Sequence, residues 1–136
     1  MSNQQEESAG QFWKRVLVVD DQYGIRLLLN EILKKEGLEA LLASTGQQAL
    51  EFVREKRPGL ALVDMRIPGM NGVDILKKIK EINPEIKVMI MTAYGDDQMI
   101  REAKKNGAIA YFSKPFDIEK LLTVIHRQLP LENGNS

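Results

Sequence analysis

Residues 60–69 read LALVDMRIPG, in which the unbroken apolar run at 60–63 ends in the carboxylate of Asp64. A short apolar run of this kind, without alternation, is typical of a strand buried inside a parallel sheet. The Pro-Gly pair that follows closes the segment as a loop. A carboxylate at the end of a buried strand costs free energy unless something pairs with it or uses it. This stretch therefore predicts a central strand and marks Asp64 as a candidate functional residue.

The pattern of residues 60–64 recurs along the chain. Further apolar runs cover residues 16–19, 38–43, 88–91 and 108–112. Helical patterns lie between and after them, at residues 22–36, 46–57, 71–82, 96–106 and 118–129. Gly37 and Gly107 follow two of these helices, and Asp117 precedes the last as an N-cap candidate. Five strand–helix units predict an α/β fold: a doubly wound, five-stranded parallel sheet covered on both faces, in the order 2-1-3-4-5, a flavodoxin-like (βα)5 arrangement.

The length of 136 residues fits one domain with a substantial core. Residues 1–12 are polar and are expected to form a disordered lead-in. We expect the folded domain to cover residues 13–130 and a flexible tail to cover 131–136. Phe12 and Trp13 are expected to give hydrophobic cover to the first strand.

Composition excludes several classes of function. Basic and acidic residues number 19 each, so no global attraction to nucleic acid or an anionic membrane is expected. The absence of cysteine excludes disulfides and thiolate metal sites. No apolar run approaches the roughly 20 residues of a membrane span, and the N-terminus lacks the apolar core of a signal peptide. The expected location is the cytoplasm.

Polar residues end four of the five predicted strands. They are Asp20 and Asp21 after the first strand, Asp64 after the third, Thr92 after the fourth and Lys114 after the fifth. The carboxyl ends of parallel strands share one edge of the sheet, and ligands bind there at the switch in strand order. Individually these residues have ordinary explanations: a helix cap for either aspartate, a strand-end cap for Thr92 and a solvated surface position for Lys114. Their convergence on one edge favours a site.

The residue types at this edge indicate phosphoryl chemistry. Neighbouring carboxylates repel one another, and a divalent cation would hold them ionised. Oxygen ligands without Cys or His favour Mg²⁺, with Mn²⁺ as an alternative. An aspartate can attack phosphorus to give an aspartyl phosphate, with Lys114 and Thr92 neutralising charge on the phosphoryl oxygens. Ala93 would leave space for that group.

Four segments carry a resemblance to a known family: VVDD at 18–21, LVDMRIPGMNG at 62–72, MTAY at 91–94 and FSKPF at 112–116. With these motifs the chain resembles a response regulator receiver domain from about Arg15 to Leu129. Within the family it is similar to phosphorelay intermediates of sporulation control. One departure is Gln22, where many receivers carry another acid.

The resemblance implies a role for each motif residue. Asp64 would be the phosphoacceptor, with Thr92 and Lys114 contacting the phosphoryl oxygens and Tyr111 at the aromatic switch position. The Mg²⁺ ligands would be Asp20, Asp21, Asp64 and the backbone carbonyl of Arg66.

The resemblance also implies protein partners. The chain has no Gly-rich phosphate loop followed by Lys, so the phosphoryl group must come from outside. The implied donor is the phosphohistidine of a sensor histidine kinase, and the implied acceptor is a histidine phosphotransferase domain. An aspartyl-phosphate phosphatase is a further candidate partner, and the protein is expected to be a monomer. The first predicted helix carries more apolar surface than a core needs, which suits either a generous core helix or a docking surface. The candidate docking residues implied by the resemblance are Gln22, Gly24, Ile25, Leu28, Arg66, Tyr94, Pro115 and Phe116.

The expected function is that of a single-domain phosphorelay intermediate without an output domain. One alternative is a stand-alone switch that keeps its phosphoryl group and changes its affinity for another protein. A second is a hydrolase with an aspartyl-phosphate intermediate, which the basic Arg66 two residues after Asp64 disfavours. Whether the chain counts as an enzyme stays open, since it would catalyse its own phosphorylation without turning over a small molecule. His126, the single histidine, is expected to be an exposed or packing residue rather than a relay group.

Overall fold

The computed structural model describes residues 14–93, 97–115 and 117–129. The predicted lead-in and tail, together with Phe12 and Trp13, lie outside these residues. Five strands alternate with five helices through the described chain, as the sequence predicted. In chain order the elements are β1 (Arg15–Val19), α2 (Tyr23–Lys35), β2 (Glu39–Ala43), α3 (Gly46–Lys56), β3 (Leu60–Asp64), α4 (Gly72–Ile82), β4 (Lys87–Thr92), α5 (Asp97–Lys105), β5 (Ala108–Ser113) and α6 (Ile118–Gln128).

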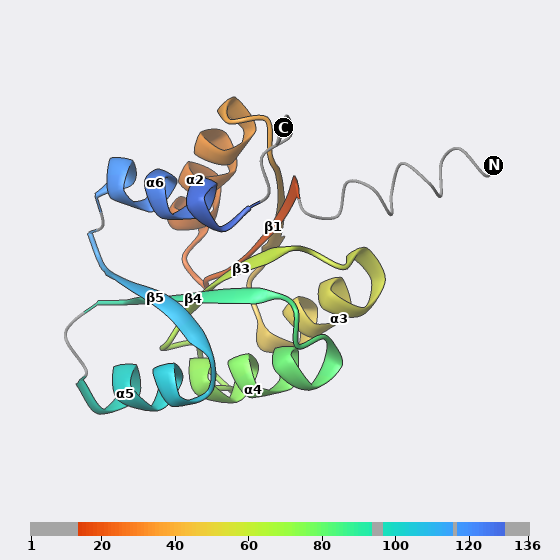
Figure 1. Cartoon of the computed structure of the whole chain (residues 1–136), viewed down its shortest axis with the longest axis vertical. Helices are drawn as coiled ribbons and strands as arrows, with labels where there is room; N and C mark the ends of the chain where they lie inside the picture. The colour runs from red at the N-terminus through yellow and green to blue at the C-terminus, as the bar shows by residue number, and fades with distance from the viewer. Residues whose placement is uncertain (1–13, 94–96, 116, 130–136) are drawn as a thin grey trace.

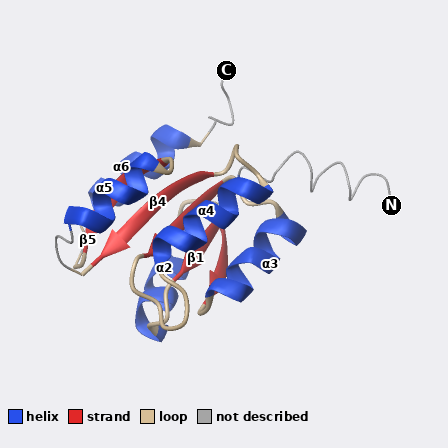
Figure 2. Ribbon diagram, turned by 90° about the horizontal axis from the view of Figure 1, so that it is seen from below, coloured by secondary structure: helices blue, strands red, loops and turns tan. Residues whose placement is uncertain are grey.

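The five strands form one parallel sheet in the order β2-β1-β3-β4-β5, which confirms the predicted topology. Helices α2 and α6 cover one face of the sheet, and α3, α4 and α5 cover the other (Figure 1). Figure 2 shows α3 and α4 side by side across the sheet. Because β1 and β3 are parallel neighbours, their carboxyl ends lie at one edge of the sheet. The strand order reverses between them, since β2 lies on one side of β1 and β3 to β5 lie on the other.

The central strand β3 is buried along its whole length. Leu60 and Leu62 pack in the apolar layer beneath α2 and α6, whereas Ala61 and Val63 pack beneath the opposite helices. Successive strand residues point to opposite faces, so an unbroken apolar run fills both layers at once. This burial fixes the register of the strand and brings Asp64 to its end.

The edge strand β5 differs from the expectation of burial on both faces. Its residues alternate between half-buried and exposed, and Ile109 and Tyr111 are 42% and 45% exposed. Ala110 and Phe112 face the layer of α2 and α6. β5 has only one neighbouring strand, and the opposite row of its side chains is open to solvent.

Local signals explain where helices begin and end. Gly37 and Gly107 adopt left-handed conformations, with φ of 77° and 104°, just after α2 and α5. Asp117 caps α6 by accepting hydrogen bonds from the backbone N–H groups of Glu119 and Lys120, as predicted. Within the described part of the chain, no helix has both the length and the apolar character needed to cross a membrane.

Candidate functional site

Asp20 follows β1 directly and is fully buried. Its Oδ1 accepts a hydrogen bond from the backbone N–H of Gln22 at 2.8 Å, and its own N–H donates to the Ala43 carbonyl at 3.0 Å. The residue at the N-cap of α2 is Gln22, whose side chain makes no capping bond. The alternative reading of Asp20 or Asp21 as the cap of this helix is therefore wrong.

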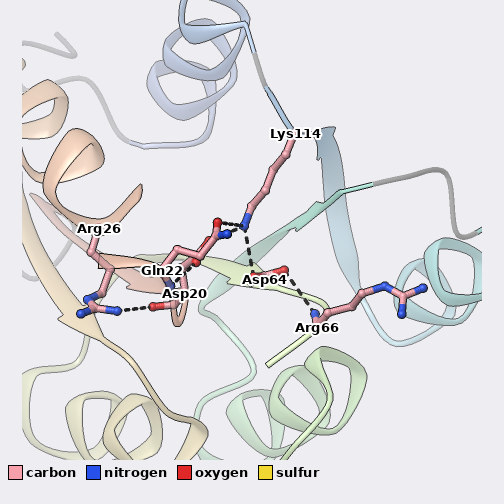
Figure 3. Close-up of polar contacts among 6 residues, drawn as sticks. All are labelled: Asp20, Gln22, Arg26, Asp64, Arg66 and Lys114. Atoms are coloured by element: carbon pink, nitrogen blue, oxygen red, sulfur yellow. Dashed lines mark hydrogen bonds and ion pairs between the residues drawn. The ribbon is translucent and has the colours of Figure 1, made fainter. Parts of the chain in front are cut away.

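Asp64 is the last residue of β3 and is 5% exposed. Its Oδ1 accepts a hydrogen bond from the backbone N–H of Arg66 at 3.2 Å. The Arg66 side chain points away from the carboxylates (Figure 3). One oxygen of Asp64 is thus fixed by the loop after the strand, and Oδ2 faces the space between its own carboxylate and that of Asp20.

Lys114 reaches into that space from the loop after β5 (Figure 3). Its backbone N–H donates to the Thr92 carbonyl at 2.7 Å, which anchors the loop to the end of β4. Its ammonium nitrogen lies 2.7 Å from Asp20 Oδ2 and 3.1 Å from Asp64 Oδ2. Gln22 Oε1 lies 3.4 Å from the same nitrogen. The ammonium therefore sits among three oxygens, two of them from carboxylates.

Burial and charge act in opposite directions on these groups. Burial raises the pKa of Asp64 above its ordinary value, against the lowering effects of the Arg66 N–H and the Lys114 ammonium. Burial lowers the pKa of Lys114, but its bonds and charge interactions with Asp20 and Asp64 outweigh it and leave the pKa above its ordinary value. Lys114 therefore stays charged at neutral pH, while the ionised form of Asp64 carries a net cost.

The three aspartates fit a divalent cation. One carboxylate oxygen each from Asp20, Asp21 and Asp64 lies within 4.8 Å of the others, and Asp21 is exposed to solvent. Magnesium takes oxygen ligands and keeps several waters, which the open side at Asp21 accommodates. The net cost of ionising Asp64 is consistent with a site that binds more positive charge than Lys114 supplies.

Thr92 and Tyr111 lie on the fourth and fifth strands, as the sequence predicted. Thr92 ends β4 and is fully buried at the same edge as the carboxylates. Tyr111 lies on the exposed face of β5, with Lys104 Nζ 5.2 Å from the centre of its ring. Thr92 therefore lies at the same edge of the sheet as the carboxylates, whereas Tyr111 is exposed to solvent.

Six of the eight candidate docking residues lie in the described part of the chain. Gln22, Gly24, Arg66 and Pro115 are exposed, Leu28 is 43% exposed, and Ile25 is half-buried against the core beneath α2. Tyr94 and Phe116 lie outside the described residues. The same helix also exposes Tyr23 and Leu27, at 69% and 47%, which the list of candidates omitted. The excess apolar surface predicted for this helix is thus present on α2, and it includes two side chains outside the list of docking candidates.

Arg26 contacts the site, although sequence reasoning did not select it. Its Nη1 donates to the backbone carbonyl of Asp20 at 2.7 Å (Figure 3). A bond to a main-chain oxygen leaves no side-chain pattern, so no motif could have indicated it. His126, by contrast, is half-exposed with its Nε2 2.7 Å from Glu36 Oε1, away from the site, as expected of a surface residue.

Comparison with known proteins gives consistent results. A family model described as "Response regulator receiver domain" matches residues 16–126. The chain is 51% identical over 121 residues to sporulation initiation phosphotransferase F of Bacillus subtilis (strain 168), which covers 89% of this chain and 98% of that protein. It is 36% identical to the chemotaxis protein CheY of Thermotoga maritima over 84% of this chain and 96% of that protein.

A solved structure agrees with these sequence likenesses. The crystal structure of a CheY-like response regulator receiver domain protein from Methanospirillum hungatei JF-1 superposes with a TM-score of 0.80. Sequence identity in that comparison is 32%, and it covers 83% of this chain and 90% of the other. The likeness therefore extends over the whole sheet and its helices.

Proposed function

Since this chain belongs to the response regulator receiver family, we propose that it is a phosphorelay intermediate that carries a phosphoryl group on Asp64 between two histidine-bearing proteins. The donor is a sensor histidine kinase and the acceptor a histidine phosphotransferase domain. Likeness over nearly the full length of the sporulation initiation phosphotransferase supports a relay that controls sporulation. The proposed setting is a cytoplasmic monomer with Mg²⁺, or Mn²⁺ in its place.

One observation carries the proposal: the Lys114 ammonium lies within bonding distance of the carboxylates of both Asp20 and Asp64. In the proposed transfer an Asp64 oxygen attacks phosphorus, a P–O bond forms and the P–N bond to the partner's imidazole breaks. The imidazole nitrogen keeps the electron pair of that bond. The reverse exchange on a second partner regenerates the Asp64 carboxylate.

The residues around Asp64 supply charge and orientation. Lys114 moves its interaction from the carboxylate to a phosphoryl oxygen, and the Thr92 hydroxyl donates to another. Asp20, Asp21, Asp64 and the Arg66 carbonyl would hold Mg²⁺, which neutralises phosphoryl charge. When Thr92 moves toward the phosphoryl group, Tyr111 moves inward from its solvent-exposed position. This movement of Tyr111 is the proposed conformational switch.

Docking uses the apolar surface of α2 together with the loop after β5. The proposed docking residues in the described part of the chain are Gln22, Gly24, Ile25, Leu28, Arg66 and Pro115. Tyr94 and Phe116, which lie outside the described residues, complete the proposed set. A helical partner surface suits this face, because apolar anchors one helical turn apart fit a groove between helices. An aspartyl-phosphate phosphatase would use the same approach.

The test follows a radiolabelled phosphoryl group through two steps. A sensor kinase domain labelled on its histidine is mixed with the protein and Mg²⁺, and a histidine phosphotransferase domain is then added. We expect label to appear on this chain and then on the second partner, with neither step in Asp64→Asn. Asp74→Asn, an exposed aspartate in the first turn of α4, is the matched control and keeps both steps.

Two results would decide against the relay. Label that stays on Asp64 in the presence of several phosphotransferase domains would favour the stand-alone binding switch. Steady release of phosphate from a small ester would favour the hydrolase, which the absence of an acid at position 66 disfavours.

A further inference from the structure

Four hydrogen bonds hold Asp20, two at its carboxylate and two at its backbone. Its two side-chain oxygens accept from the Gln22 N–H and the Lys114 ammonium, and its N–H donates to the Ala43 carbonyl. The fourth contact is the bond from Arg26 Nη1 to the Asp20 carbonyl, at 2.7 Å. Three of these contacts come from the sheet, the adjacent turn and the site itself. The Arg26 contact comes from the helix that we expect to dock a partner.

The Asp20 carbonyl controls more than its own position. A peptide group is planar, so the direction of the Asp20 carbonyl also fixes the N–H and Cα of Asp21. Asp21 is exposed and contributes one of the three clustered carboxylate oxygens. The peptide between residues 20 and 21 therefore cannot rotate without breaking the hydrogen bond from Arg26 to the Asp20 carbonyl. Because the donor is charged, this hydrogen bond is stronger than one from a neutral donor.

Arg26 is itself held in place. It lies one turn into α2, where its N–H bonds to the Gln22 carbonyl at 3.2 Å, and it is half-buried. Its guanidinium carbon lies 5.8 Å from the centre of the Tyr23 ring, within the range of a cation–π contact. Tyr23 is 69% exposed, so the outer side of this arrangement faces solvent. One guanidinium thus touches both the surface of α2 and the peptide that carries two aspartates.

We propose that Arg26 is a positioning residue for the phosphoryl-transfer site: by holding the Asp20 carbonyl it sets the Asp20–Asp21 peptide for cation binding and ties that peptide to α2. This inference rests on the proposed function of the site. It assigns Arg26 no contact with the phosphoryl group. Groups that orient metal ligands from outside typically change metal affinity or activity by roughly 10–100-fold when removed.

The chain offers a matched control at the other end of β1. Arg15 Nη1 donates to the Lys56 carbonyl at 2.7 Å, the same kind of bond at the same length. Arg15 also forms an ion pair with Glu39 at 3.2 Å, and it lies at the edge of the sheet opposite the carboxylates. Arg26→Met and Arg15→Met therefore each remove a guanidinium-to-carbonyl bond, but only the first borders the aspartates.

The experiment measures Mg²⁺ affinity of the full chain by calorimetry, with no partner protein present. We expect Arg26→Met to bind Mg²⁺ about 10-fold more weakly than the parent protein. Arg15→Met keeps the parent affinity, and Arg26→Lys, which retains a charged donor, recovers part of the loss. With phosphoramidate as donor, the labelling rate of Arg26→Met falls at low Mg²⁺ and recovers as Mg²⁺ approaches saturation.

Thermal unfolding of each variant separates positioning from general instability. Equal Mg²⁺ affinity in Arg26→Met and the parent protein would overturn the proposal. So would equal losses in the two methionine variants, or a labelling defect in Arg26→Lys and Arg26→Met that saturating Mg²⁺ leaves unchanged. Because no histidine-bearing partner enters the measurement, failure of the relay and failure of this role give different results.

Discussion

Lys114 Nζ lies 3.1 Å from Oδ2 of Asp64, although the two residues are 50 positions apart in the chain. The same nitrogen lies 2.7 Å from Asp20 Oδ2, so one ammonium bridges the carboxylates that would also bind a cation. The ammonium and a bound cation would neutralise the same two negative charges. Binding of the cation should therefore weaken the ion pairs of Lys114, which leaves the ammonium free to contact a phosphoryl oxygen.

Lys114→Ala should therefore keep its Mg²⁺ affinity or gain slightly, because removing the ammonium leaves the carboxylates to the cation. Transfer of a phosphoryl group through Asp64 should fall by roughly 10²–10³-fold, the usual cost of one charge-stabilising donor. Mg²⁺ calorimetry and labelling with a phosphorylated partner measure the two effects. Asp21→Ala is the comparison, and a loss of affinity in Lys114→Ala as large as in Asp21→Ala would contradict the role given to the lysine.

Asp64→Asn should abolish phosphoryl uptake and leave the fold intact. The amide has nearly the shape of the carboxylate and can still accept from the Arg66 N–H, but its oxygen is not a nucleophile toward phosphorus. Labelling by a kinase phosphohistidine and circular dichroism check the two halves of the prediction. Label on this variant equal to that on the parent protein would move the acceptor to another residue.

The stability of the parent protein relative to Asp64→Asn should fall as pH rises through the titration of Asp64. The pKa of Asp64 is raised in the folded state, chiefly by burial, so folding disfavours its ionisation. At low pH the carboxyl is protonated in both states and carries no penalty. As pH rises from about 4 through the raised pKa of the folded state, Asp64 loses its proton first in the unfolded state. The free energy of unfolding of the parent protein therefore falls over this range.

Urea unfolding of both proteins between pH 3 and 8 measures this difference. The asparagine variant lacks the penalty, so its advantage over the parent protein should grow through that window in the absence of Mg²⁺. Lys114, whose pKa is raised above its ordinary value, keeps its charge throughout the range. A difference between the two proteins that is constant with pH would show that ionised Asp64 carries no net cost.

Mg²⁺ should stabilise the folded protein, because the three carboxylates come together only in the fold. At a Mg²⁺ concentration 100 times the dissociation constant, the gain in the free energy of unfolding is about 2.7 kcal/mol. Asp21→Asn should lose most of that gain. Thermal unfolding with and without Mg²⁺ measures it, with Asp74→Asn on the exposed face of α4 as the control that keeps the gain.

Leu28→Ala should slow phosphoryl transfer from a protein partner by about 10-fold, since an apolar anchor at an interface is worth more than about 1 kcal/mol. Labelling by phosphoramidate should be unchanged, because the small donor needs no docking surface. Ile109→Ala is the matched control, since Ile109 on β5 is 42% exposed and Leu28 on α2 is 43% exposed. Equal slowing in both variants would argue against docking at α2.

Much of this site could be predicted from the sequence because strand ends are visible there. Asp64 follows a run that is apolar at every position, and a short run of this kind is typical of a strand buried on both faces. Parallel topology then places Asp20, Thr92 and Lys114 at the same edge, which the structure confirms. The strand order itself followed from the small number of right-handed arrangements open to five such units.

Contacts made through the main chain could not be predicted in this way. Arg26 bonds to a carbonyl, an acceptor that every residue has, so its sequence position carried no signal. Arg57 ends α3 in the left-handed region, with φ of 50°, where glycine is the usual residue. The alternating exposure of β5 arises from its place at the sheet edge, which the apolar character of the strand alone did not reveal.

Lys114 contacts Asp20 although the two residues are 94 positions apart in the sequence. The backbone N–H of Lys114 donates a hydrogen bond to the Thr92 carbonyl at the end of β4. The acceptor site thus combines carboxylates at the ends of β1 and β3 with an ammonium that follows β5, the last strand in the chain. During synthesis on the ribosome, a chain that has released β1 to β4 holds the aspartates without their ammonium. We expect such a nascent chain to be inert toward a phosphorylated kinase, so that signalling starts only after β5 has left the exit tunnel and docked.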